Sequence, residues 1–417
     1  MDIAALDRAV ADHAAGVLLR YFSSIGVVAL DHPLVEIERD RELLRLHWSL
    51  SQPVSDLVAY VLEHRHEIQS ALQTSLRHED GIVRGRLDAV RTVRQRLVSG
   101  MPTAVVSHEP LRSYASGPNQ VLGWVLMQAW SLATRFETIT LDSPGYRAAI
   151  ENALQRLEQA RRIQAIGQIT GQTILNRRPG AGAVLEAGRS RRALYRMATD
   201  AYKALLAVEA GNPEIITAML RKTLLSPLEP WRRFELAVGL SAAEELALAE
   251  GQKLSLNLLV GDVRRPLAQA GRLAVFWQWR TDYYQAPEPE PSENLARAIL
   301  ETYSLSFASD RPDLVIIDRV AGHVLAIVEV KYLTGENASD RIRTAVHQIV
   351  RYARGYGDIG SIGPLLGRSL VVVSQGIDEL SPPVPLPPGT PEVADFAAIR
   401  RKGLRAWAQQ VHEARPA

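Results

Sequence analysis

Residues 311–332 read RPDLVIIDRVAGHVLAIVEVKY, and this stretch decides the fold of the C-terminal half of the chain. Two apolar runs flank a short Ala-Gly turn, which is the pattern of a β-hairpin made of two buried strands. Such strands favour valine and isoleucine, yet Asp313 opens the first run, and Glu329 and Lys331 lie near the end of the second. Charged side chains at these positions require a chemical explanation.

The predicted hairpin brings the charged side chains to one edge of a sheet. Asp313 begins one strand and Glu329 lies near the end of its antiparallel neighbour, so the two carboxylates can meet. Lys331 follows two residues later and therefore points to the same face as Glu329. Carboxylate oxygens bind Mg²⁺ or Mn²⁺, and the backbone carbonyl of Val330 can complete the metal shell. We therefore interpret Asp313, Glu329 and Val330 as candidate metal ligands.

Such a cluster suits phosphodiester hydrolysis. The cation stabilises charge on the phosphate oxygens and lowers the pKa of an attacking water, which Lys331 can orient. Each piece alone has an ordinary alternative, because Glu-x-Lys at a strand end is usually a solvent-facing ion pair and Pro-Asp is usually a turn. The order of the pieces along the chain favours a site over these alternatives.

The hairpin lies within a longer predicted series of elements in the order α-β-β-β-α-β. The helix after the hairpin carries Gln348 and Tyr352, which are four residues apart and share one helical face, where both can contact phosphate or a base. Besides the hairpin, the series comprises a helix at 230–251, an aromatic-rich strand at 273–284, a helix at 339–356 and a strand at 369–376, with a proline-bearing insertion at 285–294.

The N-terminal half is predicted to be mainly helical. Period-two patterning suggests a small β element at residues 27–48, whereas residues 53–72 have helical spacing. Asn119 is a credible N-cap of an apolar helix, and residues 142–225 are almost wholly helical in pattern. The glycine-rich loop at 176–190 has no Gly-Lys-Ser/Thr and so does not predict a nucleotide site.

One basic cluster within this helical region is a candidate face for DNA or a partner protein, and a solvated helical face is the equal alternative. It is opposed by few acids in the same window. Its members are Arg177, Arg178, Arg189, Arg191, Arg192 and Arg196.

Composition narrows the class of protein. The chain has 417 residues, no cysteine and a formal net charge of +2. Zero cysteine excludes disulfides, thiolate zinc sites, cysteine nucleophiles and cysteine-ligated iron–sulfur clusters. The N-terminus lacks the apolar core of a signal peptide, and the longest apolar stretch, at 121–133, is too short to span a bilayer. We expect a soluble, cytoplasmic protein without a membrane partner, whose nucleic-acid site would be a local patch.

The stretch from Pro312 to Tyr352 resembles the PD-(D/E)xK nuclease superfamily, in the form that carries a Gln-x-x-x-Tyr motif. The matching residues are Pro312-Asp313, Glu329 to Lys331, and Gln348 to Tyr352. The resemblance implies a further glutamate on the helix before the first strand of the core. Glu235 occupies that place, and Glu293 in the insertion competes with it. Element order favours Glu235. An equally good interpretation is that Glu235 is an acid in the first turn of its helix, favoured there by the helix dipole and without a catalytic role.

A narrower resemblance extends from about residue 80 to 375. The segments VRGRLDAVRTVRQRL (83–97) and SYASGPNQVLGWVL (113–126), followed by the helix that bears Glu235 and the nuclease core, resemble the layout of the McrC subunit of McrBC-type restriction systems. This resemblance implies a separate partner, an AAA+ GTPase or ATPase that translocates DNA.

We therefore expect an α+β or α/β protein in which a mostly helical N-terminal region precedes a restriction-endonuclease-like αβββαβ domain. The expected function is a Mg²⁺- or Mn²⁺-dependent DNA endonuclease of an McrBC-like defence system, with Glu235, Asp313, Glu329 and Lys331 catalytic. A non-catalytic adaptor that activates a partner NTPase and a stand-alone repair nuclease are the alternatives. The expected segments are an α/β region at 1–80, a helical assembly region at 81–225, the nuclease domain at 226–380, and a proline-rich linker with a basic helix at 381–417.

Overall fold

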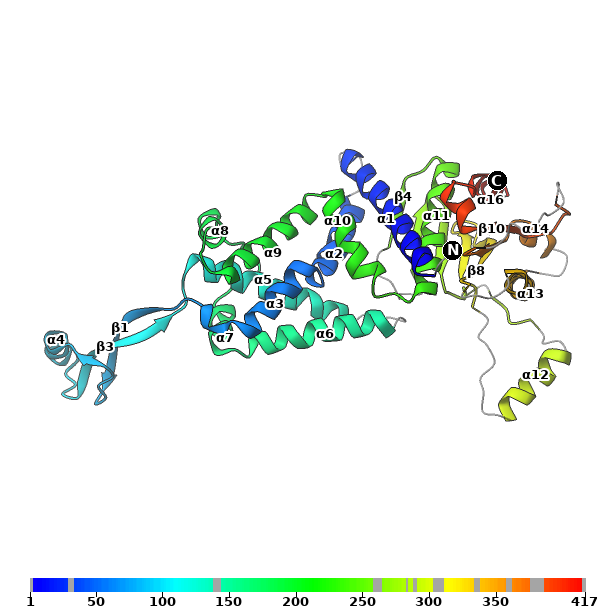
Figure 1. Cartoon of the computed structure of the whole chain (residues 1–417). Helices are drawn as coiled ribbons and strands as arrows, with labels where there is room; N and C mark the ends of the chain where they lie inside the picture. Colours follow the sequence, from blue (N-terminus) through cyan, green and yellow to red (C-terminus); the bar gives the residue numbers. More distant parts are fainter. Residues whose placement is uncertain are drawn as a thin grey trace. The chain divides into compact units, whose positions relative to one another are not determined.

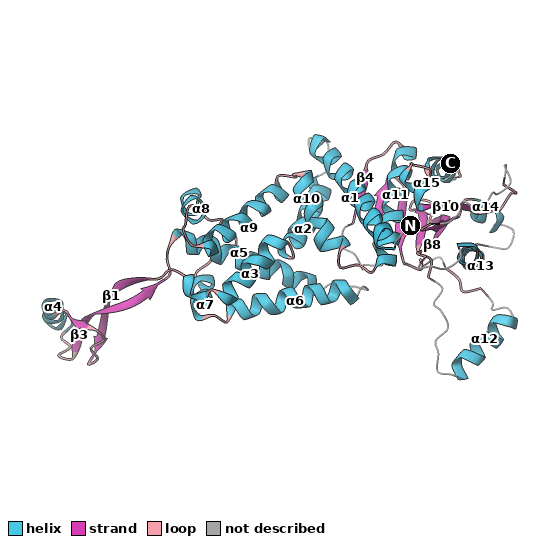
Figure 2. Ribbon diagram, viewed as in Figure 1, coloured by secondary structure: helices cyan, strands magenta, loops and turns pink. Residues whose placement is uncertain are grey.

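The chain forms two compact units. Unit 1 comprises residues 1–47, 136–150 and 207–417, and unit 2 comprises residues 48–135 and 151–206. Mixed sheet and helix confirm the expected α+β class (Figures 1 and 2). The computed structural model describes residues 3–28, 34–137, 144–257, 265–282, 284–287, 291–302, 311–333, 338–357, 362–375 and 386–414.

Unit 1 is built on a seven-stranded sheet in the order β10-β9-β8-β7-β6-β5-β4. Neighbours from β4 to β8 run antiparallel, whereas β8, β9 and β10 are parallel to one another. The strands are β4 (Leu254–Leu256), β5 (Ala268–Ala270), β6 (Leu273–Trp277), β7 (Leu314–Asp318), β8 (His323–Lys331), β9 (Leu370–Val373) and β10 (Glu392–Asp395).

Unit 1 also contains helices, which are α1 (Ile3–Val28), α2 (Leu34–Ser49, to His47), α10 (Pro213–Leu220), the short π-helix η2 (Arg221–Leu225), α11 (Pro230–Glu250), α12 (Pro291–Thr302), α13 (Ala338–Tyr356), α14 (Ile362–Gly367), α15 (Phe396–Arg400) and α16 (Arg405–Glu413). Of these, α11, α13 and α14 pack on the sheet. The predicted series α-β-β-β-α-β corresponds to α11, β6, β7, β8, α13 and β9.

Successive side chains of a strand point to opposite faces of the sheet, and each face is covered by a different helix. Gly239 of α11 lies so close to Leu314 that a Cβ on Gly239 would come within 3.1 Å of the leucine methyl, so α11 packs on the face that carries Leu314. Ile327 points to the opposite face, where it is buried with Ile349 and Tyr352 of α13. The sheet is therefore a central layer between α11 and α13.

The C-terminal segment completes the sheet and one of its helical layers. β10 pairs with β9 in parallel, and α16 packs against α11. Trp407 of α16 is 1% exposed and donates its indole N–H to the Arg368 carbonyl at 2.7 Å. The expected basic terminal helix is thus a packed element of unit 1, and the sequence patterns did not indicate β10, β4 or β5.

The β element expected at 27–48 is wrong, because α1 extends to Val28 and residues 34–49 form α2. Leu43, Leu44 and His47 are buried, a spacing of one and three residues that fits a helix face. His47 lies in a buried polar contact with the Thr223 hydroxyl at 3.1 Å. Charged residues between the apolar positions mimicked strand alternation; residues 29–33 of that stretch lie outside the described part.

Unit 2 combines helices with a three-stranded antiparallel sheet in the order β1-β3-β2 (Figure 2). β1 and β3 pair over ten residues each and form a long ribbon that carries α4. The strands are β1 (Ala71–Asp80), β2 (Arg86–Leu87) and β3 (Ala104–Ser113). The helices are α3 (Gln52–Glu63), the 3₁₀ helix η1 (Arg65–Glu67), α4 (Ala89–Ser99), α7 (Gln164–Gly171) and α8 (Ala181–Gly188), with most of α5 (Gly117–Glu137), α6 (Pro144–Arg161) and α9 (Ala193–Glu209).

Two details of unit 2 correct the sequence analysis. Helix α5 begins at Gly117, so Asn119 lies inside its first turn and is not the N-cap. Asn119 is 1% exposed; its amide donates to the carbonyls of Gln69 and Tyr114, and it accepts the Tyr195 hydroxyl at 2.7 Å. The helix expected across residues 53–72 ends at Glu63, and η1 leads into β1. No helix among the described ranges has the length and apolar character needed to cross a membrane.

Candidate active site

The register of β7 and β8 places Asp313 opposite Glu329. Leu314 pairs with Val328, and one further step along the two strands brings Asp313 and Glu329 together on the face covered by α13. The Val330 N–H donates to Asp313 Oδ2 at 2.7 Å. Lys331 Nζ donates to Glu329 Oε1 at 2.5 Å, and both side chains are well buried. The carboxylates and ammonium expected from the sequence therefore do converge.

Glu235 reaches the same cluster from α11. Its side chain is 5% exposed, and Oε2 accepts hydrogen bonds from Trp277 Nε1 at 2.9 Å and from Gln278 Nε2 at 2.6 Å. The negative charges of Asp313 and Glu329 both act on its carboxyl group. The alternative Glu293 lies on α12, and its side chain is outside the described part. Glu235 is therefore a buried member of the cluster and not an exposed acid near the start of its helix.

Gln278 links Glu235 to the start of β7. Besides its bond to Glu235, its side-chain oxygen accepts from Arg311 Nη2 at 2.6 Å, and its backbone N–H donates to the Asp313 carbonyl at 2.8 Å. Gln278 has φ of 50°, a left-handed conformation that non-glycine residues rarely adopt. In a continued strand its side chain would share the face of Phe276, away from α11. The turn at Gln278 breaks this alternation and lets the amide reach Glu235.

Burial raises the pKa values of all three acids, and the charge of Asp313 raises those of the two glutamates further. Burial, followed by the charge of Asp313, raises the pKa of Glu235 well above its ordinary value, against the hydrogen bonds from Trp277 and Gln278. Burial and Asp313 raise the pKa of Glu329 to about 8, although Lys331 opposes the shift. Burial also raises the pKa of Asp313, despite the nearby Lys331 charge and the Val330 N–H. Groups of this kind, with mutually perturbed pKa values, are typical of functional sites.

The donor set fits a divalent cation. Glu329 Oε2 is buried and has no hydrogen-bond partner among the described residues, so one oxygen of this carboxylate is left without a counterpart. Within the same residues, no three His, Cys, Asp or Glu side chains form a ready-made metal cage. Asp313 and Glu329 would therefore supply two carboxylates, and water, substrate phosphate and a backbone carbonyl such as that of Val330 would supply the rest. Mg²⁺ sites commonly have this composition.

Gln348 and Tyr352 lie on the face of α13 that packs on the sheet, but they differ in what they offer. Gln348 is half-buried, and its Oε1 is buried without a hydrogen-bond partner in the described part of the chain. Tyr352 is 2% exposed, and its hydroxyl donates to the Arg311 carbonyl at 3.3 Å. Burial and the charges of Glu329 and Asp313 raise the pKa of the Tyr352 hydroxyl. Tyr352 is thus positioned to hold the segment before Asp313, and Gln348 has an amide oxygen available.

Comparisons with known proteins leave the family open. No protein-family model matches the sequence, and no curated protein matches it either. Among solved structures, the chain is similar to one from a half-complex of Thermococcus gammatolerans McrB AAA+ hexamers with bound McrC. The superposition covers 96% of this chain and 75% of that chain, at 12% identity and a TM-score of 0.24. A similarity of this size carries no argument about the site.

The sequence patterns did not point to two residues that contact the cluster, Gln278 and Arg311. Gln278 lies in the aromatic run FWQWR, between Trp277 and Trp279. Phe276 of this run is buried in a core cluster, and its ring centroid lies 4.3 Å from that of Trp279. Gln278 and Arg311 are far apart in the sequence, and no motif relates their positions. They meet because of the turn at Gln278.

Proposed function

We propose that this chain is a divalent-metal-dependent DNA endonuclease whose site is formed by Glu235, Asp313, Glu329 and Lys331. The observation that carries the proposal is the convergence of three carboxyl groups and one ammonium, from three elements, at the ends of β7 and β8; Glu235 and Glu329 are buried, and Asp313 is half-buried. A stable core gains nothing from such a group of acids, because burial without a counter-ion is unfavourable for each of them. Their arrangement is what phosphodiester hydrolysis requires.

The residues have separable roles in this proposal. Asp313 and Glu329 would hold Mg²⁺ or Mn²⁺, which supplies charge stabilisation at the phosphate and a more acidic water. Lys331 orients that water and meets the negative charge that develops on the phosphate oxygens. Glu235 fixes Gln278 and adds negative charge that favours cation binding. Arg311, held by Gln278, places a guanidinium next to the cluster, where it can contact a phosphate.

Cleavage of supercoiled and linear DNA by the full chain, with Mg²⁺ or Mn²⁺ and with a candidate motor protein present, tests the proposal. We expect Asp313→Ala and Lys331→Ala to abolish cleavage. Both variants should remain folded, with a thermal unfolding transition like that of the wild type. The matched control is Asp340→Ala, because Asp340 is an exposed acid on α13 whose ion pair is with exposed Arg343. Full cleavage by either site variant refutes the assignment, as does equal loss of cleavage in the control.

A second role, activation of a partner AAA+ GTPase or ATPase, is favoured by unit 2. Helix α4, carried by the β1–β3 ribbon, leaves large apolar side chains in water: Val90 and Leu97 are each 80% exposed, and Val93 is 57% exposed. These three residues follow helical spacing and share one face. Contiguous apolar surface of this kind usually marks a protein contact. The two roles are compatible, because a nuclease subunit can also stimulate its motor.

NTPase turnover of a candidate AAA+ protein, measured with and without this chain, tests the second role. We expect stimulation by the wild type and by Asp313→Ala, and loss of stimulation in a Val90→Asp, Leu97→Asp double variant. Asp56→Asn on α3 changes charge in the same unit without touching α4 and is the control. Unchanged turnover upon addition of the wild-type chain rejects the adaptor role and leaves the nuclease proposal intact.

A further inference from the structure

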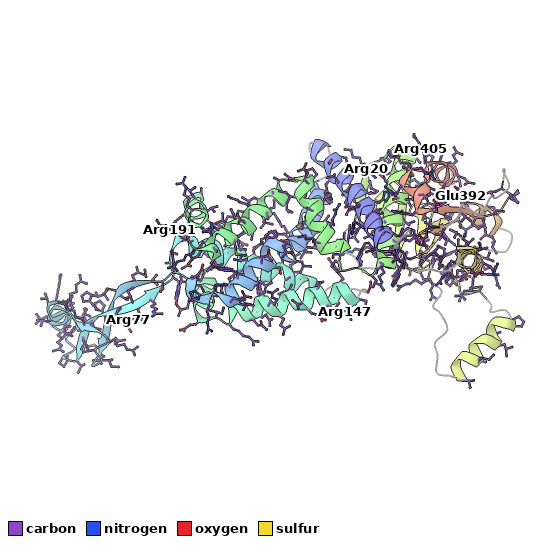
Figure 3. The ribbon with its side chains drawn as sticks, viewed as in Figure 1. Arg20, Arg77, Arg147, Arg191, Glu392 and Arg405 are labelled. Carbon is purple, nitrogen blue, oxygen red and sulfur yellow. The ribbon has the colours of Figure 1, made fainter. Side chains whose placement is uncertain are left out.

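Unit 2 contains a cavity with a basic lining that neither proposed role uses. Its volume is about 680 Å³, and it lies at the turn between α8 and α9 (Figure 3, Arg191 labelled). The polar residues of the wall are Gln69, Glu186, Arg189, Ser190, Arg191 and Arg192. The structure therefore divides the arginine cluster found in the sequence: three of its six members line one cavity, whereas Arg177, Arg178 and Arg196 do not.

The turn that carries these arginines is held rigidly. Arg192 donates a guanidinium N–H to the Glu67 carbonyl, and its backbone N–H donates to the Ser190 hydroxyl at 3.2 Å. Arg196 donates to the carbonyls of Ser190 and Arg191 at 2.9 and 2.8 Å. The hydrogen bonds of Arg192 and Arg196 thus fix the backbone around Arg191. A binding group presented on such a fixed turn loses less conformational entropy when a ligand binds.

The charge of the cavity is not balanced by the protein. Within the described part of the chain, neither Arg189 nor Arg191 forms an ion pair, and both side chains are exposed. The acid in the lining, Glu186, lies against the start of α5: a Cβ on Gly117 would come within 2.5 Å of its Oε2. Its carboxylate is therefore near the peptide N–H groups that open α5, and it pairs with neither arginine. Two guanidinium groups of the lining therefore have no acidic partner among the described residues.

We propose that this cavity binds backbone phosphates of DNA, as a second contact separate from the carboxylate cluster. Guanidinium groups bind phosphate oxygens through paired hydrogen bonds. The lining contains no aromatic side chain on which a base could stack, so recognition depends on phosphate and not on the base. A free nucleotide carries the same phosphate chemistry, and a cavity of this size could admit one. The missing stacking platform favours the DNA backbone.

Fluorescence anisotropy with a labelled DNA duplex measures this contact without cleavage. The full chain is used in chelator, so that binding does not depend on nuclease activity. We expect Arg189→Ala with Arg191→Ala to weaken binding about tenfold and to lower the slope of log K against log salt by about two, since each lost phosphate contact contributes about 0.9. The lysine pair at the same positions keeps the charge and should retain an intermediate affinity.

The chain offers a matched control for these variants. Arg162 and Arg177 are also exposed arginines of unit 2, lie outside the cavity, and change the net charge by the same amount when replaced by alanine. We expect the control pair to change affinity by less than about twofold. Equal losses in the two pairs would overturn the proposal in favour of general electrostatic attraction. Circular dichroism on each variant verifies the fold.

Titration with a nucleoside triphosphate and with inorganic phosphate separates the possible sources of phosphate. If the cavity pair loses nucleotide binding while DNA affinity stays at the wild-type value, the cavity belongs to a free nucleotide and the DNA assignment is overturned. Loss of DNA affinity in the cavity pair alone supports the assignment. Both results are independent of whether the carboxylate cluster cuts DNA, because neither measurement involves cleavage.

Discussion

Replacement of Glu329 by glutamine should change how the stability of unit 1 depends on pH. Burial and the Asp313 charge raise the pKa of Glu329 from 4.5 to about 8 in the folded chain. Between these two values the folded state holds a proton that the unfolded state has lost. The stability of the folded state therefore falls as the pH rises from about 4.5 and levels off above about 8. Glutamine does not titrate, so Glu329→Gln removes this contribution to the slope.

The magnitude follows from the shift in pKa. Each pKa unit corresponds to about 1.4 kcal/mol, so the three units between about pH 5 and pH 8 amount to about 4 kcal/mol. A domain of this size changes its unfolding temperature by about 2–4 °C per kcal/mol, which predicts a relative gain of about 8–16 °C for the variant at the alkaline end. Asp313 and Glu235, whose pKa values are also raised, maintain a slope of the same sign in the variant.

Differential scanning calorimetry of the full chain, across this pH range in chelator, measures the slope. Glutamine keeps the shape of the side chain, and its amide oxygen can still accept a hydrogen bond from the Lys331 ammonium. The comparison therefore isolates the effect of the charge. Glu214→Gln, an exposed acid in the first turn of α10, is the matched control and should follow the wild type. Added Mg²⁺ should stabilise the wild type most at high pH. Parallel curves for wild type and Glu329→Gln would refute the electrostatic account of the cluster.

Three further substitutions test other parts of the structure. Gln278→Ala removes the side-chain link between Glu235 and Arg311, and we expect kcat for DNA cleavage to fall at least about tenfold while the unfolding temperature changes little; unchanged kcat would contradict the link. Asn119→Ala removes three hydrogen bonds inside unit 2, those to the carbonyls of Gln69 and Tyr114 and that from the Tyr195 hydroxyl, which should cost about 2–4 kcal/mol in urea unfolding. Trp407→Ala should lower the stability of unit 1 by about 3–5 kcal/mol, and a loss below about 1 kcal/mol would mean that α16 is not part of its core.

The part of the fold that could be predicted is the part in which local pattern and tertiary packing agree. The hairpin of β7 and β8 combines long apolar runs with a tight turn, and the helix α13 has a strong amphipathic period, so their order along the chain specifies the centre of the sheet. β4, β5 and β10 have three or four residues each, too few to show alternation. Such short strands, at the edges of the sheet or next to one, form because the neighbouring strand offers its backbone groups, which no local pattern reports.

The carboxylate cluster could be predicted for a related reason. Asp313 and Glu329 are one hairpin apart, so strand register alone brings them together. The place of Glu235 depended on the resemblance, because a helix acid has no register with a strand. Gln278 and Arg311 could not be predicted, since their meeting depends on one left-handed residue after β6. A contact between an arginine and an amide that are far apart in the chain is set by tertiary geometry.

That left-handed residue also explains how acids from both faces of the sheet can share a site. Asp313 and Glu329 point to the face covered by α13, whereas α11, which carries Glu235, covers the other. A regular β6 that continued past Trp277 would separate them by the thickness of the sheet. Because the strand ends there and Gln278 turns, Glu235 meets the cluster around the end of β6. Strained backbone of this kind costs about 1–3 kcal/mol and is retained mainly at functional sites. The strain and the raised pKa values thus lie at the same strand ends, as expected if this edge was selected for chemistry and not for stability.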